Sequence, residues 1–492
     1  MTNKLFFALV TLSFIFPTNG LFAADVSLAG PTSIIEAPPS PKFTDAERQA
    51  ELARRRSAVA AEMADDSVLV LFSAEPKLYT NDVDYAFRQE NNLYYLTNLK
   101  QAGATLVMVK SGGKVSQTVY IPKRIPAQET WNGHMYSHEE AAKISGIKNI
   151  VDSSERKAFL DNLKSGAATV AKNVYLLLPE GPNDSDGMRE FRVENEFSKQ
   201  LSGRKATNAQ PIFAKLRQIK SPYEIKMLQH AVDISVEAHM RAQAAAPKAS
   251  MEYEVQAELE YTFRRRNADF WGYPSIVGCG SNATTLHYEE SQSAVTPGSL
   301  LLIDAAAEYD HNSADVTRTF PVNGKFTKEQ AEIYQIVYDA QEAAAKLAKP
   351  GATMSQMSNA ADEVLKDGLF KLGLITDKNS QQFRIWYMHG LGHWIGMNVH
   401  DVGEYGLPLA PGMTFTNEPG IYIRADALDY LPDTAENKAF IAKIRPAFEK
   451  YKNIGVRIED DMLITPTGVE WMTGKLPRKI TDIEAFMAVA SK

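Results

Sequence analysis

The chain has 492 residues, of which 44% are hydrophobic and 23% charged, and its formal net charge is -7 at pH 7. This length exceeds that of one ordinary domain and predicts two. The acidic balance and the lack of a long basic run argue against nucleic acid as a partner. The single cysteine, Cys279, excludes an internal disulfide.

The N-terminal segment has the features of a secretory signal peptide. Lys4 precedes an apolar run over residues 5–16, a Pro/Asn/Gly break, and small residues at Ala23 and Ala24. A membrane anchor is the alternative, but the run is shorter than the roughly 20 residues that cross a bilayer. We expect residues 1–23 to be cleaved, the protein to be exported (periplasmic or secreted), and the mature chain to have no membrane span.

The next part of the sequence predicts a linker and then a mixed α/β domain. Residues 24–45 are rich in Pro and Ser and should form an extended linker. A helix should begin near Thr44. Over residues 46–208, helical segments alternate with short apolar runs typical of strands, among them SVLVLF (67–72) and NVYLLLP (173–179).

Residues 209–485 contain an internal repeat. The series helix, helix, histidine and acid-tipped strand occurs twice in the same order. The matching members are Pro247 and Pro350, His287 and His400, and Asp304 and Glu418. Coincidence of common Pro-Gly turns is the alternative explanation. We predict a duplicated α+β unit with its site between the two halves.

Acidic residues in segments that read as buried mark that site. Asp304 ends an apolar run, and Asp315 begins the alternating stretch DVTRTF, so the two runs should pair as a hairpin. Glu459 shares a strand face with Arg457, and a plain salt bridge is the alternative for this pair. Buried carboxylates are normally paired or bind metal. The candidate ligands are Asp304, Asp315, His393, Glu418 and Glu459.

Oxygen ligands with one imidazole favour hard or borderline divalent ions, Mn²⁺ before Zn²⁺. Two such ions bridged by carboxylates can activate water for amide hydrolysis. The glycine-rich segment MHGLGHWIGMNVHDVG (388–403) carries His389, His393 and His400 and should wrap the site as a loop. Histidines that bind no metal are candidates for hydrogen bonds to substrate or intermediate.

Five segments in order resemble the pita-bread metallopeptidases, within them the aminopeptidase P and prolidase branch. They are LLIDAAAEY (301–309), SADVTRTFPVNGKFT (313–327), MHGLGHWIGMNVHDVG, TNEPGIY (416–422) and GVRIEDDMLIT (455–465), and FRQENNLYYLTN (87–98) extends the likeness to the N-terminal domain. The resemblance implies an α+β pita-bread catalytic domain, cleavage of the bond before proline, and a homodimer or homotetramer.

The resemblance also implies residue roles. Asp304 would bind one metal, His393 and Glu418 the other, and Asp315 and Glu459 would bridge them. The implied catalytic residues are His287, His389, His400, Glu418 as proton carrier, and Arg457. The implied substrate-binding residues are Tyr273, His287, His389, His400 and Tyr422. Tyr273, Tyr288 and Trp394 are candidates for contact with the proline ring, with plain packing in the core as the alternative for these aromatic residues.

Two departures from the family pattern stand out. Ala306 replaces a usual glycine, which should add a methyl group near the metal, and residues 424–453 form an insertion like that of prolidases. The favoured function is an Xaa-Pro aminopeptidase with two divalent ions, Mn²⁺ first and Co²⁺, Zn²⁺ or Fe²⁺ next, acting on peptides with proline second. Alternatives are a prolidase restricted to Xaa-Pro dipeptides, a non-catalytic peptide-binding module, and a creatinase-like amidinohydrolase.

Overall fold

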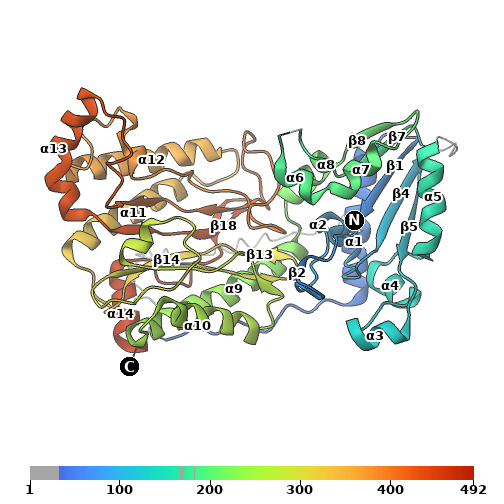
Figure 1. The fold of residues 1–492 in the computed structure, drawn as a ribbon, viewed down its shortest axis with the longest axis horizontal. Helices are drawn as coiled ribbons and strands as arrows, with labels where there is room; N and C mark the ends of the chain where they lie inside the picture. Colours follow the sequence, from blue (N-terminus) through green and yellow to red (C-terminus); the bar gives the residue numbers. More distant parts are fainter. Residues whose placement is uncertain (1–32, 166–170, 182, 492) are drawn as a thin grey trace, which may run out of the picture.

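The computed structural model of the chain describes residues 33–165, 171–181 and 183–491. The predicted signal peptide, residues 1–23, lies outside these residues. Figure 1 shows two parts side by side, with the N-terminal part at the right and the larger C-terminal part at the left. Among the described helices, none combines the length and apolar character needed to cross a membrane.

The N-terminal part is built on a six-stranded sheet in the order β6-β5-β4-β1-β7-β8. Its central strand β1 (Ser67–Phe72) is buried along its whole length, antiparallel to β4 and parallel to β7. The predicted strands are therefore confirmed. The other strands of this sheet are β4 (Thr105–Ser111), β5 (Lys114–Ile121), β6 (Ile150–Asp152), β7 (Asn173–Leu176) and β8 (Lys205–Asn208). Strands β2 (Leu78–Thr80) and β3 (Val83–Asp84) form a separate two-stranded sheet.

The helices of this part begin with α1 (Asp45–Glu62), whose cap is Thr44, as the sequence predicted. The Thr44 hydroxyl accepts from the Glu47 N–H, and the Glu47 carboxylate accepts from the Thr44 N–H, so both exposed donors are satisfied. The others are α2 (Asn91–Thr97), α3 (Pro126–Asn132), α4 (His138–Ser145), α5 (Ser153–Ser165), α6 (Ser185–Glu190), α7 (Arg192–Ser198) and the connecting α8 (Gln210–Gln218).

The C-terminal part repeats one arrangement, which confirms the predicted α+β duplication. Helices α9 (Pro222–Ala245) and α10 (Glu252–Arg265) pack together in the first half, and α11 (Lys328–Ala345) and α12 (Met354–Leu372) do so in the second. The first half has the sheet β10-β11-β14 and the second has β15-β18-β19. In Figure 1 the strands β14 and β18 lie between the two helix pairs.

The remaining elements complete these two halves. The strands are β9 (Phe270–Trp271), β10 (Ile276–Cys279), β11 (Leu300–Asp304), β12 (Ala307–Tyr309), β13 (Asn312–Ser313), β14 (Thr317–Pro321), β15 (Thr414–Asn417), β16 (Gly420–Tyr422), β17 (Gly455–Arg457), β18 (Asp460–Thr465) and β19 (Gly468–Trp471). The helices are α13 (Ala435–Tyr451), α14 (Ile480–Ala490) and the short 3-10 turns η1 (Ala246–Lys248), η2 (Gly280–Thr284) and η3 (Gln381–Ile385).

The two halves meet where β14 lies beside the start of β18. The Glu459 N–H donates to the Thr317 carbonyl at 3.1 Å, which forms an isolated bridge between the sheets. Behind this bridge, Arg318 and Asp460 form an ion pair at 2.6 Å with both side chains fully buried. Because a buried pair of this kind fixes geometry, the two sheets hold a defined register at the seam.

The predicted pairing of the two aspartate-bearing runs is also confirmed. Strands β11 and β14 are antiparallel, with Asp304 opposite Thr317. Between them the chain continues as a smaller hairpin, β12 and β13, whose tip residues Asp310 and His311 both have positive φ. Asp304 and Asp315 therefore lie at the base of this smaller hairpin, and its tip points away from them.

Two further segments have clear positions. The insertion at residues 424–453 contains α13, which packs on α11 through a face with buried Phe440, Ile444 and Phe448. In the predicted linker, residues 34–37 have no regular secondary structure and lie along α9, where the Ala37 N–H donates to Glu237 at 2.7 Å.

Candidate metal centre

All five candidate ligands occupy the ends of strands or the loops between them. Asp304 ends β11, Asp315 precedes β14, Glu418 follows β15, and Glu459 stands between β17 and β18, while His393 lies in the glycine-rich loop. This loop contains no helix, as the sequence predicted. All five side chains line one cavity of about 530 Å³.

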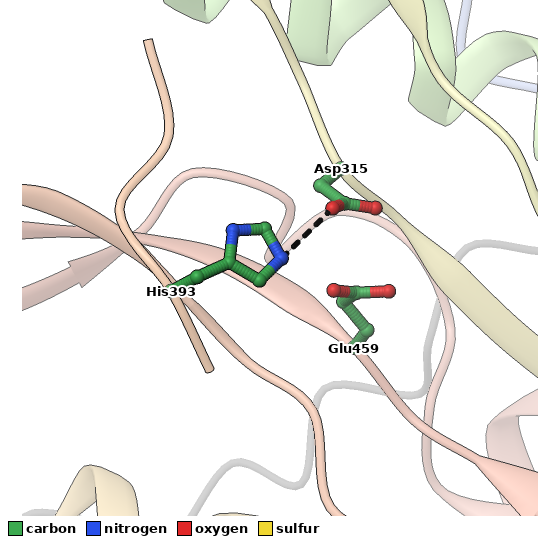
Figure 2. A group of neighbouring side chains, drawn as sticks. All are labelled: Asp315, His393 and Glu459. Carbon is green, nitrogen blue, oxygen red and sulfur yellow. Dashed lines mark ion pairs between the residues drawn. The ribbon is translucent and has the colours of Figure 1, made fainter. Parts of the chain in front are cut away.

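Three of these side chains converge closely in Figure 2. Asp315, His393 and Glu459 each offer a ligand atom within 4.8 Å of the others. The His393 Nε2 lies 3.3 Å from Asp315 Oδ2 and 3.4 Å from Glu418 Oε1. Its Nδ1 is 3.2 Å from the Trp394 carbonyl, an arrangement that directs Nε2 toward the carboxylates.

Neighbouring hydroxyl groups orient the carboxylates. The Thr317 hydroxyl donates to Glu459 at 2.6 Å, and the Thr416 hydroxyl donates to Glu418 at 3.1 Å. The Tyr273 hydroxyl donates to Asp304 Oδ1, and its oxygen accepts from the Val316 N–H. Ligands held in this way are ready for a metal, because their orientation is fixed before it binds.

The electrostatics show that the cluster requires added positive charge. Burial, opposed by Arg457, raises the pKa of Asp304. Burial and the nearby Asp315 carboxylate raise the pKa of Glu459 well above its usual range. Burial also raises the pKa of Glu418 to about 7, despite the opposing charge of His393. A divalent cation relieves this repulsion, so the residues fit a divalent metal ion.

The pKa of His393 is also shifted by the neighbouring carboxylates. Although burial alone lowers its pKa, the hydrogen bond and charge of Asp315 raise the pKa of His393 to about 9. The carboxylates therefore attract a cation to the position of the His393 Nε2. A metal ion at this position takes the place of that proton.

Arg457 connects Asp304 to His389 through Tyr422. Its Nη2 pairs with Asp304 Oδ2, whereas its Nε is 4.0 Å from Glu459, so the plain salt bridge with Glu459 is not its main contact. Its Nη1 donates to the Tyr422 hydroxyl at 2.9 Å. Tyr422 lies 2.8 Å from the His389 Nε2. Burial, aided by Arg457, lowers the pKa of His389 to about 3, so this ring is neutral.

The predicted histidines all line the cavity but differ in their freedom. Both ring nitrogens of His389 are engaged, with Tyr422 and with the Gly390 carbonyl. His287 and His400 are exposed to the cavity and form no hydrogen bond with another described residue. The His400 ring packs on His393 with centroids 4.1 Å apart. The ring nitrogens of His287 and His400 are therefore available to a bound molecule.

The structure corrects four expectations. Tyr422 is fully buried and does not line the cavity, so it supports Arg457 and His389 instead of meeting substrate directly. Trp394 is fully buried against Phe415 and Tyr405, and the Tyr288 hydroxyl donates to Glu252 at 2.8 Å; neither lines the cavity. The Ala306 methyl joins the hydrophobic core and not the metal site.

Some lining residues were missed by the sequence analysis. Glu289 is an exposed carboxylate on the cavity wall that pairs with no described residue. An apolar patch of Pro274, Ile276, Leu286 and Val399 also lines the cavity. The position of Glu289, two residues after His287, was a usable signal. The apolar patch combines residues from three segments, which no local pattern reveals.

Comparisons with known proteins agree with this geometry. The chain matches Aminopeptidase P, N-terminal domain, over residues 52–171 and Metallopeptidase family M24 over residues 226–466. It is 36% identical to the Xaa-Pro aminopeptidase of Haemophilus influenzae over 448 residues, which is 89% of this chain and 97% of that protein. For the Xaa-Pro aminopeptidase of Escherichia coli, the identity is 34% over 90% of this chain and 98% of that protein.

Solved structures give the same result. Aminopeptidase P from Escherichia coli in a low-pH form has a TM-score of 0.79 and 32% identity, covering 92% of this chain and 100% of that chain. The zinc-substituted enzyme in complex with product gives the same values. The predicted aminopeptidase P resemblance is thus confirmed across both domains, and the chain belongs to metallopeptidase family M24.

Proposed function

We propose that this protein is a metal-dependent Xaa-Pro aminopeptidase, which removes the first residue from peptides with proline in second position. The observation that carries the proposal is the convergence of four carboxylates and His393 in one cavity that His287 and His400 also line. Relatives named Xaa-Pro aminopeptidase match nearly the whole chain, and solved structures of aminopeptidase P share its fold.

The proposed cofactor is a pair of divalent ions, with Mn²⁺ first and Co²⁺, Zn²⁺ or Fe²⁺ as substitutes. Asp304, Asp315, His393, Glu418 and Glu459 would hold them, with Asp315 and Glu459 placed centrally enough to be shared. When bound, such ions supply an activated water nucleophile and polarise the scissile carbonyl. Four carboxylates balance the charge of two divalent ions, which supports a dinuclear site over a mononuclear one.

The surrounding residues have distinct proposed roles. Glu418 lies among the ligands and borders the cavity, so it takes the proton released by the attacking water and returns it to the proline nitrogen. His287 and His400 donate hydrogen bonds to oxygen atoms of the substrate as negative charge develops. Arg457 and Tyr422 keep Asp304 and His389 in place.

The cavity also suits the substrate. A bond before proline is a tertiary amide without an N–H, so recognition cannot rely on strand-like hydrogen bonds at that position. The apolar patch of Pro274, Ile276, Leu286 and Val399 offers a surface for the pyrrolidine ring. None of the lining residues comes from the insertion at 424–453, which packs on α11. Because the insertion forms no wall of the cavity, we favour peptides longer than a dipeptide over a dipeptide-only substrate.

A direct test compares two substrates. The purified protein is stripped with chelator, reloaded with Mn²⁺, and incubated with an Xaa-Pro-Yaa tripeptide or an Xaa-Pro dipeptide, and the products are identified by mass spectrometry. We expect metal-dependent release of Xaa from the tripeptide. Cleavage of the dipeptide alone would establish a prolidase, and no cleavage of either peptide would overturn the proposal.

A further inference from the structure

Arg88 of the N-terminal part reaches both halves of the catalytic part with a single guanidinium group. Its Nε lies 2.8 Å from Glu308 Oε2, and its Nη2 donates to the Met397 carbonyl at 2.7 Å. Its Nη1 donates to Asn91 Oδ1 at 2.8 Å, which holds the side chain against the start of α2. Arg88 does not line the catalytic cavity.

The two segments that Arg88 joins carry the candidate metal ligands. Glu308 lies in β12, on the smaller hairpin whose base holds Asp304 and Asp315. Met397 lies in the glycine-rich loop between His393 and His400. The Ser313 N–H donates to the Gly396 carbonyl at 2.7 Å, so the hairpin and the loop already touch next to Arg88.

Other contacts from the same part of the chain reach the same two segments. Asn91 Nδ2 donates to Asn398 Oδ1 at 2.7 Å. Arg217 of α8 donates to Asn92 Oδ1 at 2.8 Å and pairs with buried Asp401, the residue after His400. The Tyr94 ring stacks on His311 at the hairpin tip, with centroids 3.8 Å apart. In Figure 1, α2 lies at the boundary between the two parts.

We propose that Arg88 is a positioning residue that sets the spacing between two segments: the aspartate hairpin, residues 304–315, and the histidine loop, residues 388–403. It thereby sets the distance from Asp304 and Asp315 to His393 and His400. The proposal rests on the proposed metal site. The loop lacks regular secondary structure and contains several glycines, so its position depends on ties to neighbours. A displacement of about 1 Å at such a site costs on the order of 100-fold in rate.

The geometry specifically requires arginine. The planar guanidinium donates in three directions, to Glu308, Met397 and Asn91, and the compact lysine ammonium cannot span the same fork. Glu308 is buried, and its carboxylate has Arg88 as its ion-pair partner within the described residues. Loss of Arg88 therefore removes one tie to the hairpin and one tie to the loop at the same time.

The test uses the full chain with Arg88→Met, Arg88→Lys and a matched control, Arg192→Met. Arg192 forms ion pairs with Glu75 and Glu196, both within the N-terminal part. The first measurement is Mn²⁺ affinity by titration calorimetry, and the second is kcat and KM on an Xaa-Pro tripeptide. We expect Arg88→Met to weaken Mn²⁺ binding and lower kcat by about tenfold or more, with a smaller change in KM. Arg88→Lys should regain only part of this loss, and Arg192→Met should match the wild type.

A double-variant comparison separates positioning from general loss of stability. We compare the loss of Mn²⁺ affinity in the double variant Arg88→Met, Glu308→Gln with the losses in the two single variants. If Arg88 acts through Glu308, the loss in the double variant should be smaller than the product of the two single losses. Wild-type Mn²⁺ affinity and kcat in a folded Arg88→Met protein would overturn the proposal, as would full recovery in Arg88→Lys. Failure of the wild type to cleave Xaa-Pro peptides would instead overturn the proposed function, and the metal titration would still test Arg88.

Discussion

Replacement of Glu418 by glutamine should make the metal-free protein more stable while it abolishes activity. Glu418 Oε1 lies 3.4 Å from the His393 Nε2 in a buried cluster, and burial raises the pKa of Glu418 to about 7. Glutamine has nearly the same shape and keeps an oxygen that can accept from the Thr416 hydroxyl. The substitution therefore removes a buried negative charge and leaves the local packing intact.

The expected magnitude follows from the pKa. In the folded metal-free protein the pKa of Glu418 is raised to about 7, against an ordinary value of 4.5 for glutamate. Between these values the folded state holds a proton that the unfolded state has lost, so the wild type loses stability as pH rises from 4.5 to 7. At about 1.4 kcal/mol per pKa unit, the loss reaches about 3 kcal/mol at pH 8. Glu418→Gln has no carboxylate to titrate and avoids this loss.

The assay is urea unfolding with chelator present, at pH 5 and at pH 8. We expect Glu418→Gln to exceed the wild type in stability by about 3 kcal/mol at pH 8 and by much less at pH 5. Added Mn²⁺ should stabilise the wild type but not the variant. The control is Glu436→Gln, an exposed position at the start of α13. Equal or lower stability of the Glu418 variant at pH 8 would refute the argument that the buried Glu418 carboxylate destabilises the metal-free protein.

Three further predictions concern the site and its surroundings. His393→Ala should abolish metal binding and activity. His287→Ala should keep its metal, measured by elemental analysis, and lose about 100-fold in kcat. Loss of metal in His287→Ala would show that the roles assigned to the two histidines are wrong. Burial raises the pKa of Glu194 to about 8, so the free energy of unfolding falls as pH rises between 4.5 and 8. Glu194→Gln should flatten this pH dependence in urea unfolding. An unchanged slope in the variant would contradict the prediction. Glu289 has no cationic partner among the described residues, so Glu289→Gln should lower kcat/KM for lysine-containing Xaa-Pro peptides about two- to fivefold relative to neutral ones; an equal change for both peptides would exclude a charge effect.

Local pattern was enough to predict the elements that carry the site. The apolar run before Asp304 and the alternating stretch after Asp315 predicted the antiparallel pair that β11 and β14 form. The glycine content of residues 388–403 predicted a loop, and the structure has no helix there. Period-2 alternation also placed Glu459 and Arg457 on the same face of their strand, and both side chains line the cavity. These features follow from backbone geometry within one segment, which the sequence alone determines.

Only the tertiary structure decided which partner each side chain meets. Arg457 pairs with Asp304, 153 positions away, more closely than with its neighbour Glu459. Trp394 and Tyr288 were plausible cavity residues by composition, but packing against Phe415 and a hydrogen bond to Glu252 turn them away from it. Arg88 gave no local sign of its contacts with Glu308 and Met397. The physical reason is that periodicity fixes the face of an element on which a residue lies, whereas its contacts depend on how distant elements pack against that face.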